Sequence, residues 1–250
     1  MSVSPETLQS APEQASPGGI IFPPGDLYSD EPPLETDLHR DQIDLLIRLL
    51  KQFWGDRQDC YASGNLTIYY SPHQRKSEDF RGPDFFVVLG TEKRPRKSWV
   101  VWEEGGKYPN VIVELLSEST AKTDRGLKKQ IYQDIFRTPN YFWFDPDSLE
   151  FEGFQLMNGT YQPIPMTEQG WRWSEQLGLY LGVQNQQLRF FTTAGELVPT
   201  AEEQAETERQ RAEAEHQRAE AEHQRAEAER LRNQELAAKL RELGVDPDTL

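Results

Sequence analysis

Three side chains between residues 84 and 128 have the chemistry needed to hold a divalent metal ion beside a phosphate. Asp84 follows Pro83 and precedes the apolar run FFVVL, and Glu114 lies inside the apolar run VIVELL. A carboxylate in such a run is costly to bury unless it is paired or coordinates a cation. Lys128 follows on the next helical segment and could orient water or stabilise charge on phosphorus. The spacing therefore indicates a hydrolytic metal site.

The ligands of this site would be oxygen atoms, which suits Mg²⁺, with Mn²⁺ as an alternative. Asp84 and Glu114 supply carboxylates, and the carbonyl of Leu115 is a third oxygen that a hard cation accepts. A simpler interpretation stays open for each residue. Pro83-Asp84 is also a common start for a strand, Glu114 could pair with Lys128 or Arg125, and lysines on helices are usually solvated.

The element before the site is a helix. Apolar residues recur at helical spacing from Leu38 to Phe53, with Thr36 or Asp37 as N-cap and Gly55 as the end. Strand-like runs follow: DCYASG, NLTIYYSP, PDFFVVLG, SWVVWEE and PNVIVELLS. Gly64-Asn65 between the first two predicts a hairpin. In the last run, a period of two places Glu114 on one face together with Ile112 and Leu116.

Residues 120–136 have the pattern of a second helix. Thr120 or Thr123 would cap it, and an apolar stripe of Leu127, Ile131 and Ile135 would be buried. Lys128 and Tyr132 lie four residues apart on an adjoining line, where Tyr132 would pack. Further strand-like runs then follow to about residue 199: YFWFDP, LEFEGFQLM, TYQPIPM, WRWSEQLGLYLGV and LRFFTT.

The chain divides into three parts by composition. Residues 1–36 are rich in Pro and predict a mostly disordered arm, in which Ile20, Ile21 and Phe22 could dock on the body. Residues 37–199 form one domain. Residues 200–250 repeat QRAEAEH with a period of seven, but Glu at the d positions prevents a dry coiled-coil seam. We expect a long charged helix that acts as a spacer, with weak self-association or partner binding near its Leu-rich end as the alternative.

The overall charge of -15 and pI of about 4.8 argue against a general basic surface for polyanions. A local basic stretch nevertheless carries seven cations, which we expect to contact nucleic acid: Arg75, Lys76, Arg81, Lys93, Arg94, Arg96 and Lys97. Cys60 is the only cysteine, and no signal peptide or membrane span is evident. These features predict a soluble, cytoplasmic protein that does not associate with membranes.

The series PDFFVV, PNVIVELLSEST, Asp124, Lys128, Tyr132 and NYFWFDP resembles the bacterial Uma-type endonuclease family. This family is a branch of the PD-(D/E)XK restriction-endonuclease-like superfamily, and the resemblance runs from about His39 to Leu197. It implies an α/β fold with a central mixed sheet flanked by helices, here extended by the long C-terminal helix.

By this resemblance, Asp84, Glu114 and Lys128 are catalytic, and the lysine has moved from its usual strand position, here Leu116, to the following helix. The superfamily's first helix often contributes an acid, for which Glu35 and Asp44 are candidates. The implied function is Mg²⁺-dependent hydrolysis of phosphodiester bonds, with DNA as the favoured substrate and RNA as a weaker alternative, because no motif in the sequence separates the two. A non-catalytic interaction protein that recruits partners through its C-terminal helix is the alternative.

Overall fold

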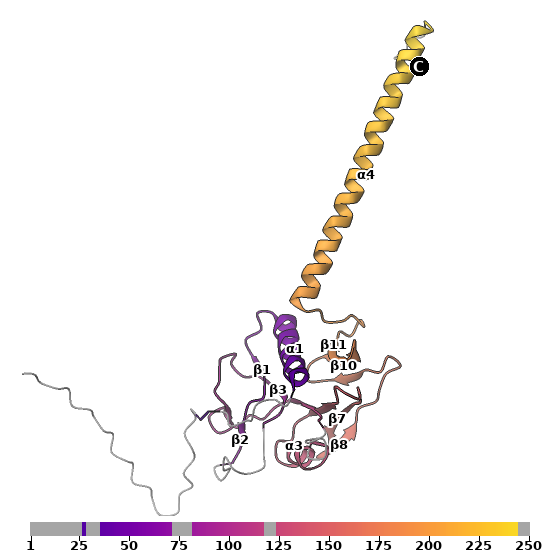
Figure 1. The fold of residues 1–250 in the computed structure, drawn as a ribbon. Helices are drawn as coiled ribbons and strands as arrows, with labels where there is room; N and C mark the ends of the chain where they lie inside the picture. Colours follow the sequence, from indigo (N-terminus) through magenta and orange to yellow (C-terminus); the bar gives the residue numbers. More distant parts are fainter. Residues whose placement is uncertain (1–26, 29–35, 72–81, 118–123, 245–250) are drawn as a thin grey trace, which may run out of the picture. The chain divides into compact units, whose positions relative to one another are not determined.

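The structure is a computed structural model, and it describes residues 27–28, 36–71, 82–117 and 124–244. The chain separates into two compact units, Met1–Val198 and Pro199–Leu250. The first unit contains the sheets and short helices shown in Figure 1, and the second contains one long helix. Each unit is described by itself.

The first helix, α1 (Asp37–Trp54), forms as its apolar spacing predicts. The Thr36 hydroxyl accepts a hydrogen bond from the amide of His39 at 3.3 Å, and Gly55 ends the helix with a φ of 53°. Its buried face carries the amide side chain of Gln42, which donates to and accepts from the backbone of Leu188 at 2.9 Å each. This pair of bonds fixes α1 against a strand far away in the sequence.

The central sheet has six strands in the order β1-β3-β5-β6-β7-β8. These are β1 (Cys60–Gly64), β3 (Phe85–Leu89), β5 (Val111–Leu115), β6 (Asn140–Phe144), β7 (Phe151–Met157) and β8 (Thr160–Pro163). Only β5 and β6 pair in parallel, so the sheet is mixed. Every residue of these two strands is buried, as expected for strands covered on both faces. The predicted α/β class with a mixed sheet is confirmed.

Alternating residues of the sheet build two separate apolar cores. Val111, Val113 and Leu115 face a core shared with α1 and with a second sheet. That sheet consists of β9 (Arg172–Ser174), β10 (Leu179–Gln184) and β11 (Gln187–Phe191). Ile112 and Leu116 face the other core. The period-two prediction for this strand is therefore confirmed, and it directs Glu114 toward the second core.

The predicted hairpin at Gly64-Asn65 is wrong. β1 pairs with β3, whereas β2 (Ile68–Tyr69) pairs in parallel with β4 (Trp99–Val100). Asn65 does adopt a positive φ of 46°, but its amide donates to the carbonyl of Asp84 and extends the β1–β3 pairing. The chain bends at Asn65, and the choice of partner depended on long-range pairing.

The second helix differs from its prediction in both form and orientation. It begins as a π-helical turn, η1 (Asp124–Lys128), and continues as α3 (Lys129–Asp134). Leu127 and Ile135, expected in the core, are 52% and 46% exposed, whereas Lys128 is buried and Tyr132 is fully buried. The predicted caps Thr120 and Thr123 lie outside the described residues. The polar line faces inward because it meets the carboxylate of Glu114, described below.

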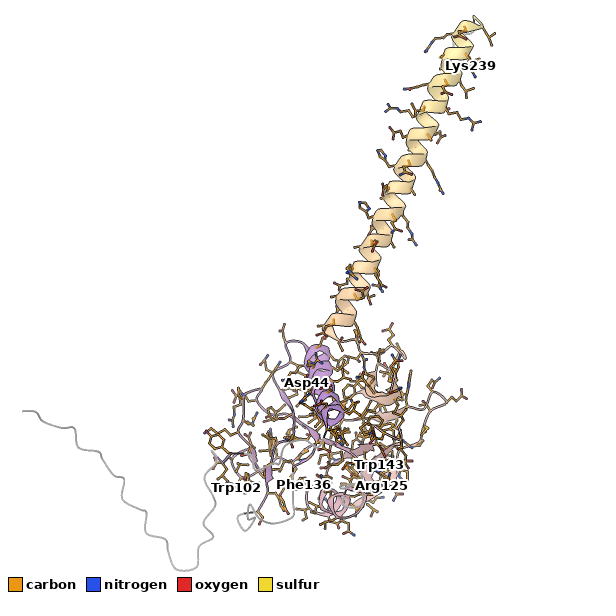
Figure 2. The ribbon with its side chains drawn as sticks, in the orientation of Figure 1. Asp44, Trp102, Arg125, Phe136, Trp143 and Lys239 are labelled. Atoms are coloured by element: carbon orange, nitrogen blue, oxygen red, sulfur yellow. The ribbon has the colours of Figure 1, made fainter. Side chains whose placement is uncertain are left out.

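The second unit is α4 (Ala201–Glu242), the long C-terminal helix that the repeat predicts. Thr200 and Glu203 form a reciprocal capping box at its start. Figure 2 shows its side chains pointing outward on all sides, and no residue of α4 is buried. Within the described part of the chain, no helix has the length and hydropathy to cross a bilayer.

Candidate active site

The register of β3 and β5 brings Asp84 and Glu114 together. The two strands are antiparallel and Phe85 lies opposite Val113, so the residue before β3 lies beside the end of β5. The backbone amide of Asp84 donates to Oε2 of Glu114 at 3.4 Å, and Oδ2 of Asp84 accepts from the amide of Leu115 at 2.8 Å. The half-buried Asp84 carboxylate is thereby held next to the fully buried Glu114.

The carbonyl of Leu115 points to the same side as these carboxylates. Leu116 donates its amide to Phe144 on β6, so the backbone of the preceding residue faces the other neighbour, β3. The bond from the Leu115 amide to Asp84 confirms this direction. Two carboxylates and one carbonyl therefore lie at one end of the β3–β5 pair.

Lys128 and Tyr132 complete the surroundings of Glu114. The Lys128 ammonium donates to Oε2 at 3.0 Å, and the Tyr132 hydroxyl donates to Oε1 at 2.5 Å. Both residues are on the same face of the η1–α3 segment, four positions apart. Lys128 is the last residue of the π-helical turn, a distortion found frequently at functional sites.

Burial dominates the electrostatics of Glu114. It raises the pKa of this carboxyl to about 8. The positive charge of Lys128 opposes that rise, the negative charge of Asp84 adds to it, and the Tyr132 hydrogen bond opposes it. A bound divalent cation would stabilise the charged form further. The protonation state of Glu114 therefore depends on whether a cation is bound beside it.

Arg125, the other cation considered as a partner for Glu114, does not pair with it. Its guanidinium lies 4.5 Å from the ring centre of Trp143 and 2.7 Å from the Glu150 carboxylate. Figure 2 labels Arg125 and Trp143 near each other, and Trp143 is buried. Lys128 is thus the cation of the buried carboxylate.

The donor set fits a hard cation. Mg²⁺ is usually held by one or two carboxylates and keeps several water molecules. Asp84, Glu114 and the Leu115 carbonyl supply that number of oxygens, whereas no group of three or more His, Cys, Asp or Glu side chains suited to a metal occurs among the described residues.

The candidate acids of the first helix do not join this group. Asp44 is largely exposed and pairs with Arg48 at 3.0 Å. Its helix packs on the Val113 face of the sheet, opposite to the face of Glu114. Glu35 lies outside the described residues.

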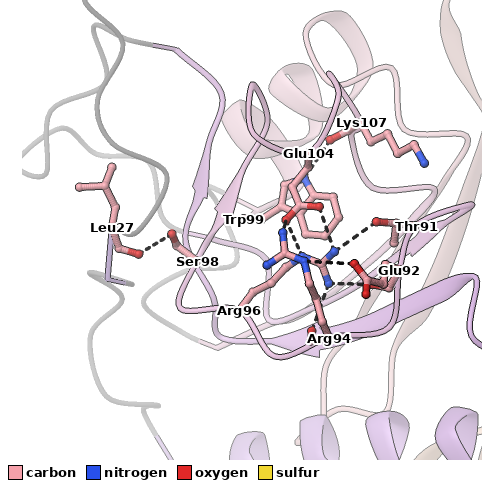
Figure 3. A network of polar contacts seen from close by, with 9 residues as sticks. All are labelled: Leu27, Thr91, Glu92, Arg94, Arg96, Ser98, Trp99, Glu104 and Lys107. Atoms are coloured by element: carbon pink, nitrogen blue, oxygen red, sulfur yellow. Dashed lines mark hydrogen bonds and ion pairs between the residues drawn. The ribbon is translucent and has the colours of Figure 1, made fainter.

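The basic stretch is divided between residues that the structure describes and residues that it does not. Arg75, Lys76 and Arg81 fall outside the described ranges. Figure 3 shows Arg94 and Arg96 bonded to Glu104, at 2.7 Å and 2.6 Å. The Arg96 guanidinium is also 4.6 Å from the ring centre of Tyr61. Arg96 therefore has a role inside the fold.

The two lysines of this stretch also make internal contacts. Lys93 donates to the Gly55 carbonyl at 3.4 Å, and Lys97 lies 4.4 Å from the ring centre of Tyr28. Both lysines lie in the segment between β3 and β4 and take part in contacts within the first unit.

Comparison with known proteins places this site in a family context. A family model described as "Uma2: Putative restriction endonuclease" matches residues 6–194, which is most of the chain. The chain belongs to the Uma2 family. The resemblance inferred from the sequence motifs is thereby confirmed, and the Uma2 match includes Asp84, Glu114 and Lys128.

One solved structure with similarity to this Uma2 chain is a "putative nuclease belonging to DUF820" from Anabaena variabilis ATCC 29413. The sequences are 12% identical, the TM-score is 0.43, and the match covers 58% of this chain and 76% of the other. No curated protein matches the chain.

Sequence reasoning missed the contribution of Tyr132. The residue was expected only to pack, but its hydroxyl bonds directly to Glu114. A usable signal was present, because Lys128 and Tyr132 are four residues apart on a helical segment. The obstacle was the apolar stripe, which favoured the opposite face of the helix.

Proposed function

We propose that this Uma2 protein is a Mg²⁺-dependent endonuclease that hydrolyses phosphodiester bonds, with DNA as the substrate. The observation that supports it most strongly is the fully buried Glu114, bonded to Lys128 and adjacent to Asp84. Family membership supports nuclease chemistry. The buried carboxylate of Glu114 indicates where the catalytic site would lie. Burying such a group costs free energy that a purely structural role does not recover well.

Asp84, Glu114 and the Leu115 carbonyl would hold the metal ion. When bound, Mg²⁺ would supply charge stabilisation and make a water molecule more acidic. Asp84 is oriented for this by the hydrogen bond from the Leu115 amide. Asp84 directly precedes β3, and Glu114 and Leu115 lie at the end of β5, so the pairing of these two strands sets the positions of the three oxygens.

Lys128 would orient the attacking water and neutralise charge that develops on the phosphoryl oxygens. Its ammonium is already held at the site by Oε2 of Glu114. An ammonium has three donor hydrogens, so it can keep this bond and still offer another donor to water or phosphate. Tyr132 would hold Oε1 and so keep the carboxylate plane aligned.

The experiment that tests this proposal measures cleavage of supercoiled, linear and single-stranded DNA and of RNA with Mg²⁺, with Mn²⁺ and with EDTA. Asp84→Asn, Glu114→Gln and Lys128→Ala are each expected to lower cleavage at least about 100-fold, as typical for loss of a charge-stabilising group. Asp44→Asn is the matched carboxylate control, because Asp44 lies on the exposed side of α1. Undiminished cleavage in the three site variants would refute the proposed centre.

A second candidate function rests on α4. This helix has 42 residues and none is buried, so its entire surface is open to a partner. In that case the Uma2 domain would serve as a platform and α4 would recruit another protein or a second copy. A chain that ends at residue 198 would then lose its binding partner, whereas the nuclease hypothesis predicts unchanged cleavage by the same chain.

A further inference from the structure

Two features of the fold place Arg125 beside the proposed catalytic site. It lies in η1 three residues before Lys128, whose ammonium donates to Glu114. Its guanidinium also lies 4.5 Å from the ring centre of Trp143. Trp143 is the register partner of Glu114 in the parallel β5–β6 pair, and neighbouring strands are about 4.8 Å apart. Arg125 therefore stands over the strand next to that of the buried carboxylate.

The Arg125 guanidinium keeps hydrogen-bond donors within reach of a ligand. A guanidinium has five N–H donors, and the contact with the Trp143 ring engages none of them in a hydrogen bond. The bond to Glu150 engages Nη2 at 2.7 Å, and 44% of the Arg125 side chain is exposed to solvent. Arg125 can therefore donate two parallel hydrogen bonds to a phosphate while it stays over Trp143.

Glu150 is the group that a phosphate would replace. Its side chain is 55% exposed, so the ion pair with Arg125 lies in water, where such pairs contribute little to stability. The ion pair of Arg96 with Glu104 differs, because both of those side chains are at least nine-tenths buried. Exchanging Glu150 for a phosphate replaces one anion by another at the surface, whereas releasing Arg96 would break a buried pair.

The other two cations of the η1–α3 segment point into the fold. Lys128 is buried against Glu114. The Lys129 ammonium lies 3.3 Å from the ring centre of Phe154 on β7, and burial lowers the pKa of this half-buried side chain. Of the three cations, Arg125 is thus the one whose side chain is open to solvent beside the site.

We propose that Arg125 binds a DNA phosphate next to the one that is cleaved, and that it releases Glu150 when it does so. This assignment rests on the proposed nuclease function and names a substrate-binding residue for it. Trp143 holds the guanidinium in place before the substrate arrives, so that less conformational freedom is lost on binding. Arg125 then acts on the affinity for DNA, whereas Lys128 acts on the reacting phosphate.

Fluorescence anisotropy with a short labelled DNA duplex tests the assignment on the full chain. Ca²⁺, which also takes oxygen ligands, replaces Mg²⁺ in this assay. Arg125→Gln is expected to weaken binding about tenfold, as for the loss of a charge-assisted hydrogen bond. It should also reduce the slope of log K against log salt by about 0.9, the value for one phosphate contact. Glu150→Gln should tighten binding about two- to fivefold, because it removes the anion that competes for Arg125.

The matched control is Arg48→Gln. Arg48 is 53% exposed and pairs with Asp44 at 3.0 Å, so it is an exposed arginine in an ion pair, but its helix packs on the opposite face of the sheet. This variant should leave the affinity and the salt dependence as in the wild type. If the Arg125–Glu150 pair served only the fold, Arg125→Gln and Glu150→Gln would not change DNA affinity in opposite directions.

Cleavage with Mg²⁺ separates this assignment from the nuclease proposal. Arg125→Gln should raise KM for DNA and leave kcat within about twofold, as expected for a lost binding contact. Cleavage with unchanged KM and unchanged DNA affinity in this variant, or weaker binding by Glu150→Gln, would overturn the assignment and leave the nuclease proposal standing. DNA binding that follows Arg125 and Glu150 as expected, in a protein that cleaves neither DNA nor RNA, would overturn the nuclease proposal and retain the phosphate contact.

Discussion

Replacing Glu114 by Gln should remove a large pH dependence of stability from the metal-free protein. The folded-state pKa of this carboxyl is about 8, raised chiefly by burial, whereas its ordinary value is 4.5. The folded protein therefore binds a proton more tightly than the unfolded chain. Stability from this group is fully present below about pH 4.5, declines as pH rises, and is lost above about pH 8.

The magnitude follows from the two pKa values. Their difference, at about 1.36 kcal/mol per pKa unit, corresponds to about 5 kcal/mol over the whole range. This is a substantial part of the ~5 to 15 kcal/mol that stabilises a typical domain. Gln has nearly the same shape and does not titrate, so the variant should lack this decline. It should consequently be more stable relative to the wild type at about pH 9 than at about pH 5.

The assay is urea unfolding in EDTA between about pH 5 and pH 9, followed by the fluorescence of buried tryptophans such as Trp99. All other titrating groups are common to both proteins, so the difference between the two pH profiles isolates Glu114. Asp44→Asn, the exposed carboxylate control, should follow the wild-type profile. Parallel profiles for wild type and Glu114→Gln would refute the conclusion that burial raises the pKa of this carboxyl.

Three further predictions concern neighbouring contacts and the core. Tyr132→Phe leaves a buried carboxylate oxygen without its donor and should cost about 1 to 3 kcal/mol in urea unfolding; a cost near zero would contradict the bond. Leu46→Ala, at a fully buried position, should cost about 2 to 5 kcal/mol in the same assay, whereas Leu231→Ala on α4, where the side chain is 54% exposed, should change stability by less than about 0.5 kcal/mol. Arg96→Lys should lower the melting temperature because it removes the fork of bonds to a carboxylate, with the half-exposed Arg94→Lys as a milder comparison; equal effects would argue against a special role for Arg96.

Much of the local structure could be predicted because it depends on neighbours along the chain. Thr36 and Gly55 mark the ends of α1 through their own backbone and side-chain chemistry. The alternation in VIVELL is a property of any strand, so it correctly put Glu114 on the face of Ile112 and Leu116. The pairing of Asp84 with Glu114 was also expected, although only through the combination of motifs and not through either residue alone.

The strand partners and the orientation of the second helix depended on the tertiary structure. Gly64-Asn65 predicted a hairpin between β1 and β2, but β1 pairs with β3, because the competition between strands distant in sequence is not decided by a local dipeptide. The apolar periodicity likewise predicted that Leu127 and Ile135 are buried, whereas both side chains are about half exposed in the structure.

The amino-acid sequence by itself determined which side chains could hold a metal ion and which strand would carry the buried acid. The tertiary structure decided that Lys128 and Tyr132 face that acid. Leaving the buried carboxylate without hydrogen-bond donors would cost more free energy than leaving one leucine and one isoleucine partly exposed. Glu114 on β5 therefore determines which face of the η1–α3 segment is buried, and the local sequence pattern of that segment contains no information about it.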